Sequence, residues 1–149
     1  MNENHPALVA SRASWRCVQA HDKQGWLDLM ADDVVYDSPV GRLHGRQAMI
    51  DYFANVAEIL EFSPFEGPIE YFGDGDRVVM SCEEHIRDLR TGATTKGRWA
   101  WVIDMHDGLM TRVVHFLHFD AIEVLIGPLR EGYERTTAEM PSSKTATPS

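Results

Sequence analysis

Three stretches decide the fold of this chain: RVVMSCEEHIRDL (77–89), KGRWAWVIDM (96–105) and LMTRVVHFLHF (109–119). Each is long, rich in β-branched and aromatic residues, and free of proline, which is typical of β-strands. Thr91-Gly92 lies between the first two stretches and Asp107-Gly108 between the last two. Such pairs form tight hairpin turns, so the spacing predicts an antiparallel meander, preceded by a short strand at 69–72.

The residues before this sheet favour helices. Apolar residues recur at helical spacing from Leu8 to Val18, and residues 26–30 read as a second short helix. A third helix follows Gly45-Arg46, with one apolar stripe made of Met49, Ile50, Phe53, Val56, Ala57 and Leu60. A strand at 34–36 and a last short helix at 121–125 complete the pattern. Helices followed by a sheet predict the α+β class, with the helices packed on one face.

Length and charge limit the functional classes. The chain has 149 residues and a formal net charge of −9, which suits one domain and disfavours nucleic acid and anionic membranes as partners. We expect a domain at 1–135, a disordered Ser/Thr/Pro-rich tail at 136–149, and a cytoplasmic location. The two cysteines, Cys17 and Cys82, are too few and too far apart for a zinc cluster.

Strand parity sorts the candidate site residues into faces. In the first long strand, Glu83 and His85 share one face, and Glu84 lies on the other with apolar neighbours. Trp99 and Trp101 share a face of the second strand, and His115 and Leu117 share a face of the third. Parity alone does not say which face is covered, and a one-residue bulge would exchange the sets.

Several short motifs, in their order along the chain, resemble a known family. They are Ala31-Asp32-Asp33, Asp37-Ser38-Pro39-Val40-Gly41 and His44-Gly45-Arg46 before an amphipathic helix, then the two hairpins and Thr111-Arg112-Val113. Over residues 8–128 the chain resembles the SnoaL-like and ketosteroid isomerase-like branch of the nuclear transport factor 2-like superfamily. The resemblance implies a cone-shaped, strongly curled antiparallel sheet closed by three N-terminal helices around a deep apolar pocket.

The catalytic residues of steroid isomerases do not carry over. The resemblance puts Ser38 where those enzymes have their general base, with Asp37 one residue away. Trp99 falls near the position of their oxyanion-stabilising aspartate, and Ser14 or Trp15 near that of their first-helix tyrosine. A serine hydroxyl needs a base of its own to take a proton from carbon. A conventional steroid isomerase is therefore not expected.

Limonene epoxide hydrolases, in the same superfamily, suggest a second placement. It puts Glu83 and His85 at two of their catalytic positions and His115 at the third. Tyr36 and Ser38 fall at the positions that hold the catalytic water in those enzymes. The resemblance thus implies that His115, His85 and Glu83 move protons while Tyr36 and Ser38 hold a substrate oxygen. Asp37 is the alternative base. Two histidines and a carboxylate also match a metal facial triad, but their spacing does not indicate one, so no metal or other cofactor is expected.

An apolar pocket of this kind requires a lining. Trp99 and Trp101 are expected to form an aromatic wall. The remaining lining is expected from Trp15, Phe53, Met49 and Leu60 on the helices, Leu117 on the last strand, and Val124 and Leu125 near the mouth.

The sequence leaves three functions open. The first is a cofactor-independent enzyme that isomerises, dehydrates or otherwise cleaves an apolar, aromatic or polycyclic small molecule by proton transfer. The second is an epoxide hydrolase with a rebuilt water-activating group, and the third a non-catalytic binding domain for hydrophobic ligands. In each case we expect a homodimer or homotrimer formed through the outer face of the sheet.

Overall fold

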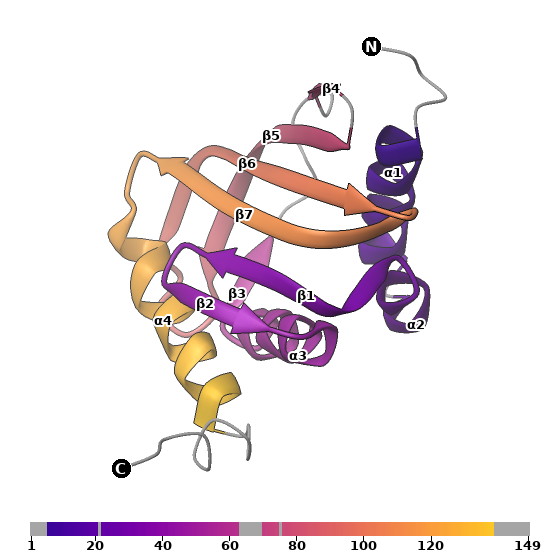
Figure 1. The fold of residues 1–149 in the computed structure, drawn as a ribbon. Helices are drawn as coiled ribbons and strands as arrows, with labels where there is room; N and C mark the ends of the chain where they lie inside the picture. Colours follow the sequence, from indigo (N-terminus) through magenta and orange to yellow (C-terminus); the bar gives the residue numbers. More distant parts are fainter. Residues whose placement is uncertain (1–5, 21, 63–69, 75, 139–149) are drawn as a thin grey trace.

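The computed structural model describes residues 6–20, 22–62, 70–74 and 76–138, and in them a curled sheet carries helices on its inner side (Figure 1). The strands are β1 (Met30–Ser38), β2 (Gly41–His44), β3 (Leu60–Phe62), β4 (Glu70–Asp74), β5 (Arg77–Asp88), β6 (Thr94–His106) and β7 (Leu109–Phe119). Their order in the sheet is β2-β1-β7-β6-β5-β3, with β4 paired to β5. The α+β class and the cone-like curl are confirmed.

The central meander forms as predicted. β5 pairs with β6 and β6 with β7, each antiparallel. Gly92 has a φ of 79°, and Asp107 and Gly108 have φ values of 51° and 78°. These are the left-handed conformations that tight hairpin turns require, and they explain the residues found there.

The sheet is mixed rather than wholly antiparallel, which corrects the expectation. β1 runs parallel to β7, with Tyr36 opposite Val113. Two strands can lie parallel only when a long connection brings the chain back, and here that connection contains a helix and most of the sheet. Turn motifs report on neighbouring segments and carry no signal for this pairing.

Four helices lie in the described residues: α1 (Pro6–Gln19), α2 (Lys23–Leu27), α3 (Arg46–Ala57) and α4 (Glu123–Ala138). The third helix is shorter than predicted. It ends at Ala57, and Leu60, which was expected on its apolar stripe, begins β3. Leu60 is buried in the strand, as it would be on the inner stripe of a helix, so its apolar character did not distinguish the two structures. No described helix is both long and apolar enough to cross a membrane.

The last helix is much longer than the predicted 121–125. α4 continues through Pro128, which is buried together with Leu129, and Thr136 hydrogen-bonds to Asn55 of α3 at 2.9 Å. Gly127-Pro128 normally ends a helix, but packing of α4 against α3 overrides that preference. The predicted tail boundary at 136 therefore lies inside the helix, and residues 139–149 lie outside the described part.

The outer face of the sheet keeps an exposed apolar strip. Phe72 on β4 and Phe116 on β7 are 57% and 56% exposed. Between them lie Val79, Val102 and Val114, which the strand register places side by side across β5, β6 and β7. Exposed apolar strips of this kind are typical of protein contact surfaces.

Candidate functional site: an apolar pocket with one carboxyl and one imidazole

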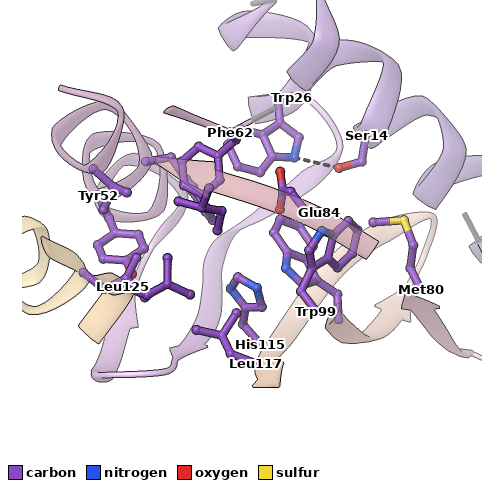
Figure 2. Close-up of a pocket in the computed structure, with 15 residues that line it drawn as sticks. Ser14, Trp26, Tyr52, Phe62, Met80, Glu84, Trp99, His115, Leu117 and Leu125 are labelled. Carbon is purple, nitrogen blue, oxygen red and sulfur yellow. Dashed lines mark hydrogen bonds between the residues drawn. The ribbon is translucent and has the colours of Figure 1, made fainter. Parts of the chain in front are cut away.

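The inner face of the sheet and the helices enclose a cavity of about 180 Å³ (Figure 2). Every helix of the described chain contributes to its lining, as do β3, β5, β6 and β7. Six of the predicted site residues line it: Phe53, Trp99, Trp101, His115, Leu117 and Leu125.

Six of the fifteen lining residues are Trp, Tyr or Phe, and their rings form a large part of the wall. Trp101 lies 6.4 Å from Trp26, nearly parallel at 21°, and 5.8 Å from Phe53 (centroid distances). Trp26 is a wall residue that the sequence analysis did not identify, since its segment was read only as a short helix. Its indole nitrogen donates a 2.7 Å hydrogen bond to Ser14 on α1, which holds the ring in place.

Other predicted lining residues lie elsewhere. Met49 and Leu60 are buried in the core but do not reach the cavity. Val124 is half-buried and also does not line it. The side chain of Trp15 lies outside the described part of the structure. The apolar pattern thus identified Met49 and Leu60 as buried without separating packing from lining, and Ala57 of the predicted stripe is exposed.

The strand register corrects the placement of two predicted catalytic residues. Directly opposite residues share a face, so His115, opposite Trp101, points inward with it. Glu83 lies opposite Arg98, to which it is ion-paired at 3.4 Å, and His85 lies opposite Lys96. Both therefore belong to the outer face. The resemblance to epoxide hydrolases thus selected outer-face residues of β5, one position away from the inner-face Glu84, and the catalytic arrangement that it implies is not present.

Glu84 occupies the inner position instead. It is only 6% exposed and lines the cavity. Burial raises the pKa of its carboxyl to about 8, and a hydrogen bond from Trp99 opposes that rise in part. A signal was present in the sequence: between Val78 and Ile86, Glu84 is the one charged residue on the face that it shares with Met80 and Cys82.

His115 also lines the cavity, whose other polar side chains besides Glu84 include Ser14 and Tyr52. Its Nδ1 lies 2.8 Å from the Tyr36 hydroxyl, and its Nε2 is buried without a hydrogen-bond partner in the described residues. Burial lowers the pKa of the imidazole to about 3, so it is uncharged at neutral pH. Tyr36 is fully buried behind His115 and is not part of the lining.

Asp37 and Ser38, two further predicted catalytic residues, are engaged in ion pairs and hydrogen bonds with neighbouring protein groups outside the cavity. Asp37 forms ion pairs with Arg42 at 2.5 Å and Arg112 at 2.8 Å, and the Arg42 hydrogen bond is the main cause of its lowered pKa. The Ser38 hydroxyl accepts hydrogen bonds from the backbone of Val40 and Gly41 in the β1–β2 turn. Neither residue lines the cavity.

Trp99 contacts both Glu84 and His115. Its indole donates to Glu84, and its ring meets that of His115 edge-on with centroids 6.4 Å apart. Figure 2 shows the Glu84 carboxyl and the His115 ring turned into the same space beside Trp99. Both groups therefore contact Trp99 from the lining of one cavity. In the part of the chain that the structure describes, no group of three His, Cys, Asp or Glu side chains is placed to hold a metal ion.

Comparisons with known proteins agree with this architecture. The family model for the SnoaL-like domain matches residues 11–113. An NTF2-like protein from Burkholderia xenovorans LB400 is 19% identical, covers 89% of this chain and 95% of its own, and superposes with a TM-score of 0.71.

Two further structures are similar in fold. TerC, co-crystallised with polyporic acid, is 25% identical over 85% of this chain and 99% of its own, with a TM-score of 0.66. A proposed polyketide cyclase from Xanthomonas campestris pv. campestris is 19% identical over 86% and 99% of the two chains, with a TM-score of 0.71. None of the curated proteins compared with this chain matches it.

Proposed function

Because this chain belongs to the SnoaL-like domain family, we propose that it is an enzyme that moves protons on a small, largely apolar carbonyl compound, with its own side chains as acid and base. The observation that carries the proposal is the carboxyl of Glu84, buried in an apolar cavity with a pKa of about 8. Strongly shifted carboxyls in clefts are typical of catalytic sites. The fold similarity to a proposed polyketide cyclase is consistent with an isomerase or cyclase type of reaction.

Glu84 has the acidity that a proton-transfer group requires. With a pKa of about 8, roughly one carboxyl in ten is ionised at pH 7, and both forms are available. The ionised form removes a proton from a carbon next to a carbonyl, and the electron pair of that C–H bond moves toward the carbonyl oxygen. The protonated Glu84 then returns the proton to another atom of the same substrate, which completes an isomerisation.

His115 is suited to hold the substrate oxygen during this transfer. It lines the same cavity, and its Nε2 has no partner within the described protein. Trp99 contacts both groups and so brings them to the same part of the cavity wall. A bound carbonyl compound would place its oxygen at His115 and the carbon next to its carbonyl toward Glu84.

The cavity size narrows the substrate class. A cavity of 150 Å³ in another protein holds one benzene molecule, and the cavity here measures about 180 Å³. We therefore propose a substrate of one or two rings. Aromatic walls from Trp26, Phe53 and Trp101 favour a planar ring system.

Hydrogen–deuterium exchange tests the function without knowledge of the natural substrate. 2-Tetralone, a two-ring ketone with exchangeable hydrogens beside its carbonyl, is incubated in D₂O with the protein and followed by NMR. We expect exchange above the buffer background. Glu84→Gln should lower the protein-dependent rate by about 10²–10⁴, the range for loss of a general base.

Glu83→Gln is the matched control, since it makes the same change one residue away on the outer face. It should exchange 2-tetralone as the unmodified protein does. Equal rates for Glu84→Gln and the unmodified protein would refute the role of Glu84. Saturable binding of 2-tetralone with no exchange above background would refute the enzymatic proposal and support a ligand-binding domain instead.

A further inference from the structure

The buried hydrogen bond between Tyr36 and His115 has a consequence for ligand recognition. We propose that Tyr36 holds His115 in the form that carries its proton on Nε2, so that the cavity presents an N–H donor and selects neutral ligands with a carbonyl oxygen. The protonation state and the ligand preference do not depend on the proposed function; only the use of this N–H donor in catalysis rests on it. Tyr36 is thus a positioning residue, because it acts through His115.

The surroundings of the Tyr36 hydroxyl decide the direction of the hydrogen bond. The Tyr36 side chain is surrounded by the rings of Tyr52, Phe53 and Trp101, whose centroids lie 5.5–6.3 Å from the centroid of the Tyr36 ring. Among the described residues, its one hydrogen bond is the 2.8 Å contact with Nδ1 of His115. If the hydroxyl accepted a proton from Nδ1, its own hydrogen would be buried without an acceptor, which is unfavourable. The hydroxyl therefore donates.

The protonation of His115 follows from this direction. Nδ1 accepts the Tyr36 hydrogen bond, so it carries no proton. The imidazole is uncharged because burial lowers its pKa to about 3. The other titratable groups of the cavity lining are Tyr52 and Glu84, and neither supplies a positive or negative charge in its protonated form. A neutral imidazole has one ring proton, which must then lie on Nε2.

The ligand must satisfy an N–H donor in an apolar cavity. Nε2 is buried and has no protein partner, so an acceptor atom on the ligand removes an unfavourable unpaired group. A carbonyl oxygen does so without adding a donor that needs a partner of its own. A carboxylate would be buried with no cationic side chain among the described lining residues and beside an ionisable Glu84. Neutral carbonyl compounds are therefore favoured.

During proton transfer the same hydrogen bond has a second role. As Glu84 takes the proton from carbon, negative charge develops on the carbonyl oxygen. The Nε2–H group of His115 donates to that oxygen throughout and keeps its own proton. A preorganised donor in a dry site stabilises developing charge more than water does.

Nitrogen NMR tests the protonation state directly. In protein labelled with ¹⁵N-histidine, long-range proton–nitrogen spectra distinguish a protonated ring nitrogen from an unprotonated one. His115 is assigned by comparison with His115→Phe. We expect a protonated Nε2 and an unprotonated Nδ1 from pH 5 to pH 8, and a mixture of the two forms in Tyr36→Phe. A protonated Nδ1 in the unmodified protein would overturn the inference.

Binding of two matched ligands provides an independent readout. 2-Tetralone and tetralin share a ring system, and only the first has a carbonyl; tryptophan fluorescence reports the affinity of each. The unmodified protein should prefer 2-tetralone by about five- to tenfold, as expected for one hydrogen bond. His115→Phe should lose this preference and still bind tetralin, whereas His85→Phe on the outer face should retain it.

An unchanged preference in His115→Phe would also overturn the inference. Neither measurement needs turnover, so a failure of the exchange assay with both results as expected would refute the proposed function alone. The NMR result on the unmodified protein stands even if His115→Phe does not fold, because substituting each of the six other histidines in turn assigns the signal of His115 by elimination.

Discussion

Replacing Glu84 with Gln should stabilise the protein increasingly as the pH rises. Burial raises the pKa of Glu84 from 4.5 to about 8. The folded protein therefore keeps a proton that the unfolded chain releases above pH 4.5. Stability is lost as the pH rises from that value toward 8, because unfolding then releases a proton. Gln retains the shape and the acceptor for Trp99 but cannot ionise, so this dependence disappears.

The magnitude follows from the two pKa values. Each pH unit between them is worth about 1.4 kcal/mol. Ionisation of Glu84 should lower the free energy of unfolding by about 1 kcal/mol at pH 5, about 3 at pH 7 and about 5 at pH 9. The stability difference between Glu84→Gln and the unmodified protein should therefore grow by about 4 kcal/mol between pH 5 and pH 9.

Urea unfolding, followed by tryptophan fluorescence at pH 5, 7 and 9, measures this difference. Comparing the variant with the unmodified protein cancels the contributions of all other titrating groups. Glu83→Gln is the matched control, since it makes the same chemical change one residue away on the exposed outer face. Parallel stability curves for Glu84→Gln and the unmodified protein would show that Glu84 titrates normally and would refute the reasoning.

Three further predictions concern other groups. Burial lowers the pKa of His115 from 6.5 to about 3, so its protonation should lower the free energy of unfolding as the pH drops from 6.5 toward 3. His115→Phe should lack this contribution in urea unfolding, and an equal fall in both proteins would contradict the prediction. 2-Naphthol should quench tryptophan fluorescence saturably at pH 7, whereas 2-naphthoate, the anion with the same rings, should not; tight binding of 2-naphthoate would count against the uncharged cavity. Two or three copies should associate through the strip around Phe116, so Phe116→Glu should give a monomer by light scattering, and an unchanged mass would exclude this surface.

Local sequence signals predicted the parts of the fold that depend on near neighbours. The hairpin turns were readable because Gly92 and Gly108 adopt backbone conformations that few other residues tolerate. The end of α4 could not be predicted in the same way, because Pro128 normally ends a helix and here lies inside one. Only the packing of α4 on α3, which places Gly132 directly against Val56, makes the longer helix favourable.

The candidate site was predictable in part for a similar reason. Periodicity placed Trp99, Trp101 and His115 on common faces, and these faces do line the cavity. The choice between Glu83 and Glu84 depends on which side of the sheet the helices cover, and that is set by contacts between distant segments. The partnership of Tyr36 with His115 joins residues 79 positions apart, so no local pattern reports it.

The parallel pairing of β1 with β7 also constrains how the protein forms during synthesis. The ribosome releases β1 long before β7 exists, so the early strand waits with one edge unpaired while the hairpins of β5, β6 and β7 assemble from local contacts. Closing so long a loop is entropically unfavourable and slow, which makes docking of β1 a late step. Tyr36 lies on β1, so the imidazole of His115 gains its partner only then. The hydrogen bond that positions His115 is therefore completed at the end of folding, after Glu84 and Trp99 are in place.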